Sequence, residues 1–266
     1  MAAPAPGMRV VVTRPLDESG PWIEGLRAAG CVPLALPLID IVMLPPASDP
    51  VSVEGLRAVM WVSGNAVRGL LAGRQAPWPA GVRCWAPGPG TAAALRAAGV
   101  PDHLIDRPVD EAPQFDSEAL WAVVAPQLRA GDAVLVVRGR SGPTAGDARA
   151  SSGRDWLIRQ CEAAGARVSA LAVYERRCPV WDDATRRAAA VAAADGSVWL
   201  FSSGEAATHL PRLLPGQDWA RTPALATHPR IAEALAGVGF RHIRTVRPTL
   251  TAVYDALRDL RASAGA

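Results

Sequence analysis

The sequence predicts an α/β protein of two similar domains, each built on a parallel sheet flanked by helices. Short apolar segments alternate with helical patterns from one end of the chain to the other. Half of the 266 residues are hydrophobic, which is enough to fill two cores. A set of short motifs also recurs in the same order in the two halves of the chain. Together these three observations predict the fold class.

The first class of element is the buried strand, recognised by a short apolar run that ends at a turn. RVVVT, at residues 9–13, is the clearest example. The expected strands and extended segments are residues 9–13, 32–41, 58–62, 82–86, 133–138, 168–175, 197–201 and 224–227.

Helices are expected between these segments, where apolar residues recur with the helical period. Three of them stop at a glycine, which is the residue that best adopts the left-handed conformation after a helix: Gly30, Gly99 and Gly165. The expected helices are residues 22–29, 66–72, 91–98, 117–128, 155–164, 181–194, 205–214, 230–236 and 251–262.

The internal repeat has a nearly constant spacing. The motif Ser-Gly-x-Ala begins at Ser63 and again at Ser203. Ala-Leu-x-x-x-Gly begins at Ala94 and again at Ala234, which is the same separation along the chain. A Trp…Ala-Ala-Gly helix end and the extended segment after it recur as well, at a slightly shorter spacing. We infer two copies of one α/β unit.

Composition excludes several function classes. The chain has no lysine, so all 28 basic residues are arginine; this excludes Schiff-base chemistry, pyridoxal phosphate anchoring and a lysine phosphate loop. The four cysteines are far apart and lack nearby histidine patterns, so we expect no metal and no disulfide framework. The arginines are dispersed, which disfavours nucleic acid as a partner.

Localisation follows from the same features. No apolar run reaches the ~18–20 residues that cross a bilayer, so no membrane contact is expected. Residues 1–7 form an Ala/Pro stretch without the pattern of a signal peptide. We therefore expect a cytoplasmic protein.

Several motifs, taken in order, resemble those of the uroporphyrinogen-III synthases from residue 8 onward. They are VVTRP (11–15), PLIDI (37–41), WVSGNAV (61–67), GPGTAAAL (88–95), DSEAL (116–120), VLVVRG (134–139), GRDWL (153–157), VYERR (173–177) and FSSGEA (201–206). Their order and spacing carry the resemblance, because the family is weakly conserved in sequence.

The resemblance implies two domains joined by a two-stranded antiparallel linker, with a cleft between the domains. Domain 1 would comprise residues 8–38 and 177–266, and domain 2 residues 44–171, with linkers at 39–43 and 172–176. Residues 140–152 depart from the family by inserting a Gly/Ser/Arg-rich loop, which we interpret as a mobile surface loop rather than a lid.

It also implies an activity. Uroporphyrinogen-III synthases cyclise hydroxymethylbilane, a linear tetrapyrrole with eight side-chain carboxylates, with loss of water and inversion of ring D. The reaction needs no cofactor and belongs to haem biosynthesis. A monomer that transiently contacts the enzyme supplying hydroxymethylbilane is the expectation.

Candidate substrate-binding residues stand in loops between a predicted strand and the next helix, where open α/β sheets bind ligands. Small residues and a helix N-terminus there suit anion binding, although ordinary N-capping by serine or threonine is an equal alternative. Arg14 and Arg138 end two strands and could hold carboxylates or simply pair with surface acids. The candidates are Arg14, Ser63, Gly64, Asn65, Gly88, Gly90, Thr91, Arg138, Ser202, Ser203, Gly204 and Thr227.

Tyr174 is the candidate catalytic residue. It lies in the VYER motif, and the resemblance places that motif beside the cleft, where a tyrosine assists departure of the hydroxyl. A phenol is protonated at neutral pH and can donate a proton. The alternative is a structural tyrosine with a packed ring. For His228, in the ATHPR turn, a surface or capping role is expected.

Two other functions fit parts of the pattern. A non-catalytic two-domain protein of periplasmic-binding-protein-like architecture would show the same repeats, but not the RG…GR…VYER order. A nucleotide-dependent transferase would need a GxGxxG fingerprint or a lysine-bearing phosphate loop, and the sequence has neither.

Overall fold

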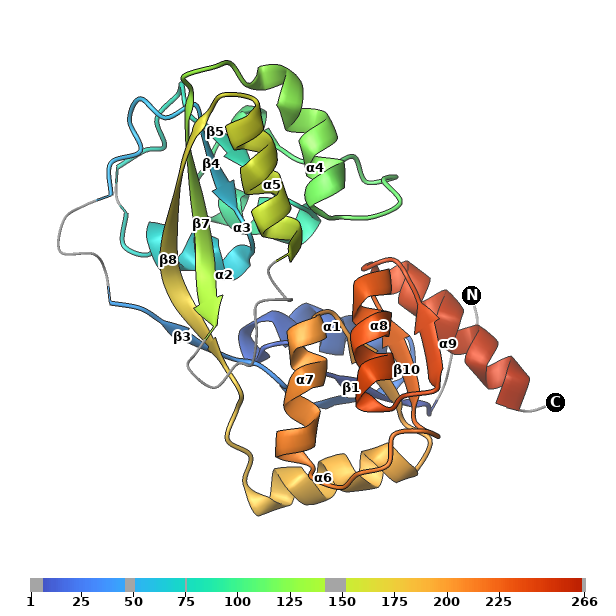
Figure 1. Cartoon of the computed structure of the whole chain (residues 1–266). Helices are drawn as coiled ribbons and strands as arrows, with labels where there is room; N and C mark the ends of the chain where they lie inside the picture. Colours follow the sequence, from blue (N-terminus) through green and yellow to red (C-terminus); the bar gives the residue numbers. More distant parts are fainter. Residues whose placement is uncertain (1–6, 46–50, 75, 142–151, 265–266) are drawn as a thin grey trace. The chain divides into compact units, whose positions relative to one another are not determined.

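The computed structural model describes residues 7–45, 51–74, 76–141 and 152–264, which form two compact units (Figure 1). Unit 1 comprises residues 1–40 and 177–266, and unit 2 comprises residues 41–176. The chain therefore enters unit 2 near Ile41 and returns to unit 1 near Arg177.

Unit 1 contains a five-stranded sheet in the order β11-β10-β9-β1-β2, and all its strand pairs are parallel. The strands are β1 (Arg9–Val12), β2 (Val32–Ala35), β9 (Val198–Phe201), β10 (Pro223–Ala226) and β11 (His242–Thr245). The helices are α1 (Leu16–Ala28), α6 (Asp183–Ala194), α7 (Gly204–Leu213), α8 (Pro229–Val238) and α9 (Leu250–Ala264). Every residue of β9 is buried, as expected for a central strand covered on both faces.

Unit 2 contains a six-stranded sheet in the order β3-β8-β7-β4-β5-β6. The pairs from β8 to β6 are parallel. The strands are β3 (Asp40–Met43), β4 (Ala58–Trp61), β5 (Arg83–Trp85), β6 (Ile105–Asp106), β7 (Ala133–Ser141) and β8 (Arg167–Arg177). The helices are α2 (Gly64–Leu71), α3 (Pro89–Ala97), α4 (Ser117–Val124) and α5 (Ser152–Ala163), with 3₁₀ turns η1 (Asp102–Leu104) and η2 (Ala125–Gln127).

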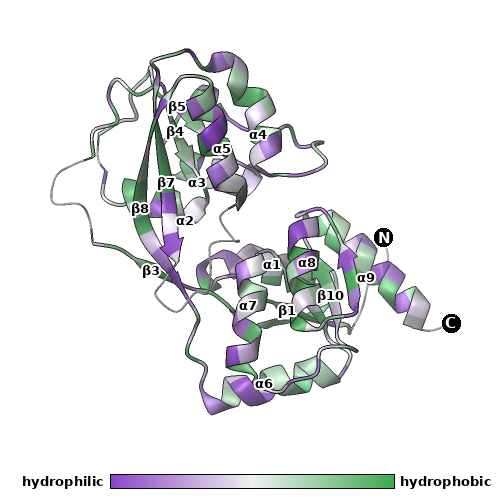
Figure 2. Ribbon diagram, in the orientation of Figure 1, coloured by the Kyte–Doolittle hydropathy of each residue, from purple (hydrophilic) through white to green (hydrophobic). Residues whose placement is uncertain are grey.

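The two faces of the unit 2 sheet carry separate cores, because side chains alternate along each strand. Val137 of β7 packs on one face with α2 and α3, in a cluster that includes Tyr174. Val136, its neighbour in sequence, packs on the other face with α4 and α5. Figure 2 shows both sheets mostly in hydrophobic colours, while the carboxyl ends of β7 and β8 turn hydrophilic.

The internal repeat of the sequence corresponds to a repeated helix contact. A Cβ built on Gly64 of α2 would lie 3.5 Å from the Cβ of Ala94 in α3. A Cβ built on Gly204 of α7 would lie 3.5 Å from the Cβ of Ala234 in α8. A Cβ at either glycine would be in ordinary van der Waals contact with the alanine, and the same motifs make the same contact in both units.

Some expected elements are longer or divided. Helix α1 begins at Leu16 rather than at residue 22, and Pro21 lies inside it. This proline has no N–H to donate to the carbonyl of residue 17, and it is tolerated because Gly20, lacking a Cβ, does not clash with the proline ring. The extended segment 32–41 divides into β2 and β3, which belong to different sheets. The expected helix 117–128 ends at Val124 and continues as η2, which contains Pro126.

Other differences concern strand ends. Strand β7 continues to Ser141, so residues 140 and 141 are strand rather than loop, and Ser152 begins α5. The rest of the expected loop, residues 142–151, lies outside the described residues. Strands β6 and β11 were not predicted, because β6 has two residues and β11 is a short edge strand with a mostly exposed pattern.

Candidate functional site

The candidate site in unit 2 is built at the carboxyl ends of parallel strands, which meet at one edge of the sheet. Strand β4 ends at Trp61, and Ser63 follows as the N-cap of α2 with an extended backbone. The Ala66 N–H donates to Ser63 Oγ at 3.3 Å, which satisfies one of the free N–H groups of the first helical turn.

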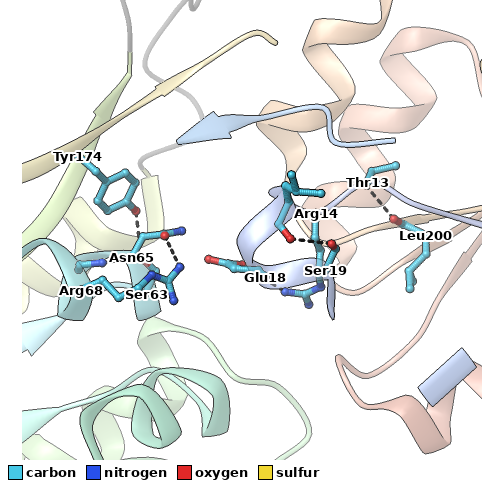
Figure 3. A network of polar contacts seen from close by, with 11 residues as sticks. Thr13, Arg14, Glu18, Ser19, Ser63, Asn65, Arg68, Tyr174 and Leu200 are labelled. Atoms are coloured by element: carbon cyan, nitrogen blue, oxygen red, sulfur yellow. Dashed lines mark hydrogen bonds and ion pairs between the residues drawn. The ribbon is translucent and has the colours of Figure 1, made fainter. Parts of the chain in front are cut away.

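Tyr174 comes to this loop from β8. Its hydroxyl lies 3.1 Å from Ser63 Oγ, and either oxygen can be the donor (Figure 3). Only 3% of the residue is exposed, and its ring is part of the core on the α2 and α3 face of the sheet. The structure therefore brings together the tyrosine and one of the loop residues that the sequence analysis had singled out separately.

A guanidinium stands one helical turn beyond Ser63. Arg68 is exposed, and its Nη2 donates to Asn65 Oδ1 at 2.5 Å, while Asn65 itself is 2% exposed (Figure 3). Asn65 thus contacts Arg68 instead of standing free for a ligand. Arg68 was not predicted as a site residue, because one arginine among 28 is inconspicuous, although its position just after a strand-loop-helix motif could have identified it.

The second loop of unit 2 precedes α3. Gly88 is the N-cap with an extended backbone, and a Cβ placed on it would lie 3.1 Å from the Cβ of Phe115. A Cβ on Gly90 would meet nothing within 4 Å, so this residue leaves the start of α3 open. Thr91 is buried. Gly88 is therefore explained by close packing, and Gly90 is the residue better suited to let a ligand approach the backbone.

Arg138 does not lie with Tyr174 and the two loops. It does not end its strand as expected, because β7 continues to Ser141. Its Nη1 lies 3.3 Å from Asp155 Oδ1 of α5. Helix α5 covers the face of the sheet opposite to the one that buries Tyr174. Of the two roles that the sequence left open for Arg138, the structure has the pairing with an acid, Asp155.

In unit 1 the corresponding loop follows β9. Ser203 is the N-cap of α7, but its side chain makes no capping hydrogen bond. Ser202 and Gly204 flank it, and Gly204 faces Ala234 of α8 as described above. Thr227 is buried after β10, where its backbone N–H donates to the carbonyl of Phe201 at 3.0 Å. His228 caps α8 by accepting the Arg230 N–H on Nδ1 at 3.1 Å, as expected.

Arg14 follows β1 and has neighbours within its own unit. Its Nη1 lies 3.6 Å from Glu18 Oε2 (Figure 3). Its guanidinium carbon lies 4.7 Å from the ring centroid of Trp22. Burial lowers the pKa of Arg14, and the nearby Glu18 carboxylate opposes that shift. An arginine stacked on an aromatic ring and paired with an acid is held in one orientation.

The residues that the structure describes contain no group of three or more His, Cys, Asp or Glu side chains that could hold a metal ion. Among the same residues, no helix is long and apolar enough to span a bilayer.

Comparisons with known proteins agree with one another. Residues 21–254 match the model of a family described as uroporphyrinogen-III synthase HemD. A uroporphyrinogen-III synthase of Synechococcus elongatus is 31% identical over 194 residues, which is 68% of this chain and 66%, slightly under two thirds, of the relative.

Solved structures are similar in fold. A mutant uroporphyrinogen III synthase of Thermus thermophilus matches with a TM-score of 0.54 and 18% identity over 97% of this chain and 99% of that one. A uroporphyrinogen-III synthetase of Helicobacter pylori matches with a TM-score of 0.57 and 17% identity over 97% and 99% of the two chains. The prediction of parallel sheets flanked by helices is confirmed.

Proposed function

Because the chain belongs to the uroporphyrinogen-III synthase family, we propose that it cyclises hydroxymethylbilane to uroporphyrinogen III, with loss of water and inversion of ring D. The observation that carries this proposal is the family match over residues 21–254, which includes both loops of unit 2 and the VYER strand. The activity is that of a cyclising lyase in haem biosynthesis.

The first chemical step is departure of the terminal hydroxyl. The C–O bond breaks with its electron pair on oxygen, which takes a proton and leaves as water. A phenol is protonated at neutral pH, so Tyr174 is suited to donate that proton. The resulting phenolate regains a proton when the pyrroles release theirs on ring closure. Tyr174 therefore acts as general acid in our proposal, and its contact with Ser63 supports this role.

The second task is conformational. Attack by the substituted carbon of ring D gives a spiro intermediate, which reopens and closes with ring D inverted, whereas unaided cyclisation does not invert the ring. Holding ring D in the inverting geometry is therefore the main contribution required of the protein.

Carboxylates on the substrate are the groups by which it can be held. An arginine guanidinium presents donors that match a carboxylate, and small loop residues before a helix expose N–H groups. We propose that Arg68 and the loop at Gly90 serve this role in unit 2, and that Ser202, Ser203, Gly204 and Thr227 serve it in unit 1. Arg68 is supported by its exposure and by the hydrogen bond to Asn65 that orients it.

We further propose a cytoplasmic monomer that receives its substrate from the enzyme producing hydroxymethylbilane. The four cysteines are unpaired thiols, which fits a reducing compartment. A direct transfer would limit unaided cyclisation of the substrate to the uninverted isomer. Size-exclusion chromatography with and without that enzyme would test both the oligomeric state and the contact.

The decisive experiment is incubation of the protein with freshly prepared hydroxymethylbilane, followed by separation of the isomers I and III after oxidation to porphyrins. Isomer III should dominate with the native protein, and isomer I with the heat-inactivated control. A protein that only binds the tetrapyrrole would slow the appearance of isomer I without producing isomer III, and that outcome would contradict the proposal.

A further inference from the structure

We propose that Ser63 is a positioning residue, whose hydroxyl donates to Tyr174 and directs the phenol proton toward the substrate. This inference rests on the proposed function, in which Tyr174 is the general acid. It also changes the role of Ser63, which the sequence suggested as a direct ligand of substrate carboxylates.

The hydrogen-bonding capacity of a serine hydroxyl supports this role. The hydroxyl has one proton to donate and two lone pairs that accept. The Ala66 N–H occupies one lone pair at 3.3 Å, and the Tyr174 hydroxyl is the other partner at 3.1 Å. A carboxylate only accepts hydrogen bonds, so Ser63 could hold one with its proton only if Tyr174 were the donor in their contact.

The direction of the bond between the two hydroxyls has a chemical consequence. If Tyr174 donated to Ser63, its proton would point into the protein and away from any leaving group. If Ser63 donates, the Tyr174 oxygen accepts, and the phenol proton is free to leave. The same serine proton then stabilises the phenolate that forms, because a hydrogen bond to a charged acceptor is stronger than one to a neutral acceptor.

Packing fixes the rest of the tyrosine. In the register of β7 and β8, Gly139 stands opposite Tyr174, and a Cβ at Gly139 would lie 2.7 Å from Cδ2 of the ring and closer still to Cε2 and Cζ. The ring therefore fills the space beside the glycine. With its ring held in this way, the phenol keeps rotation of its O–H bond as its main freedom, and Ser63 limits that rotation.

The internal repeat offers a matched comparison. Ser203 occupies the position equivalent to Ser63 in the second copy of the motif, and is likewise the N-cap of the following helix. Its side chain makes no capping hydrogen bond and, within the part of the chain that the structure describes, donates to no other group, so its proton is available to an anionic ligand. Two serines at equivalent positions are thus expected to give different kinetic signatures.

A double-mutant cycle tests the proposal. Ser63→Ala should lower kcat by roughly tenfold with little change in KM, the effect of losing one hydrogen bond that matters in the transition state. In the Tyr174→Phe background the same substitution should have no further effect, and Ser63→Thr should restore most of the rate. Ser203→Ala should instead raise KM. Independent, multiplicative losses from Ser63→Ala and Tyr174→Phe would overturn the proposal.

A second measurement does not depend on turnover. The chain has two tyrosines, Tyr174 and Tyr254, so protein labelled with ¹³C at tyrosine Cζ gives two signals, which Tyr254→Phe assigns. Ser63→Ala should shift the Tyr174 signal and leave that of Tyr254 in place; an unchanged Tyr174 signal would overturn the proposal. If the native protein made no isomer III, the proposed function would fail, and this measurement alone would decide whether Ser63 orients Tyr174.

Discussion

Gly139 and Tyr174 face one another across β7 and β8, and the tyrosine ring occupies the place that a side chain at residue 139 would fill. The register of these strands shifts between Arg138 and Gly139, so that Arg138 pairs with Ala172 and Gly139 pairs with Tyr174. The glycine of VLVVRG and the tyrosine of VYERR are therefore parts of one local structure. Their joint presence in the chain has a steric reason.

Replacing this glycine should be costly. Gly139→Ala would force the ring of Tyr174 to move within a packed core, and overpacking of this kind costs about 1–3 kcal/mol of unfolding free energy. The catalytic rate should fall as well, because the hydroxyl would leave its position beside Ser63. Urea unfolding monitored by circular dichroism measures the loss of stability.

Gly237 of α8 provides the control. It has no positive φ, and a Cβ there would meet nothing within 4 Å. Gly237→Ala should therefore leave stability unchanged or raise it by up to about 1 kcal/mol, the ordinary gain of alanine over glycine in a helix. Equal stability of the 139 and 237 variants would show that the ring of Tyr174 can move without cost.

Tyr174→Phe separates chemistry from packing. The ring and its contacts remain, so the unfolding free energy should fall by only about 1 kcal/mol, the usual contribution of one hydrogen bond. Loss of a general acid should lower kcat by ~10²–10⁴-fold. The product should remain isomer III, because this substitution leaves the groups that hold ring D intact. Stopped assays with isomer separation measure the rate and the product isomer. A near-normal rate would leave Tyr174 with a structural role.

Arg68 should contribute to substrate binding. Arg68→Ala should raise KM by roughly tenfold, the effect of losing one hydrogen bond to a charged group, and should change kcat little. Arg258→Ala is a suitable control, since Arg258 is an exposed arginine of α9 that pairs with Asp255 at 2.9 Å. Equal KM values for the two variants would argue against a carboxylate site at Arg68.

Most of the fold could be predicted from the sequence, because the central strands are continuous apolar runs and the helices end at glycines. Gly30, Gly99 and Gly165 follow α1, α3 and α5 with φ of 79°, 84° and 86°, so their conformation is the one that stops a helix. The edge strand β11 was missed because its four residues, HIRT, are mostly exposed and do not form an apolar run. Local patterns are weakest where an element is short and exposed.

The candidate site was predictable as loops but not as contacts. Ser63 and Tyr174 are 111 residues apart, and their meeting depends on the strand order of the sheet and on the register shift at Gly139. Neither the strand order nor the register shift can be predicted from a local sequence pattern. Arg138 lies two residues after Val136 in β7 and so on the same face, towards α5, which is why its partner is Asp155 and not a member of the Ser63 loop.

The buried thiols should make the protein sensitive to alkali. Burial raises the pKa of Cys84 to about 12 and that of Cys161 to about 11, from 9.0 for an unperturbed thiol. Since the folded pKa is the higher one, the unfolded chain releases these protons first as pH rises. Stability is therefore fully present below pH 9 and falls progressively between about pH 9 and 12.

Raising the pH from 8 to 10 should lower the free energy of unfolding by about 1–1.5 kcal/mol for each of the two thiols, or roughly 2–3 kcal/mol together. Urea unfolding at both pH values measures this loss, and the double variant Cys84→Ala, Cys161→Ala shows how much of it the thiols cause. The variant should start less stable at pH 8, because cavities replace two buried sulfurs, yet lose less on going to pH 10. Parallel losses in both proteins would mean that other groups, such as the phenol of Tyr254, whose pKa is raised by burial, govern the alkaline transition.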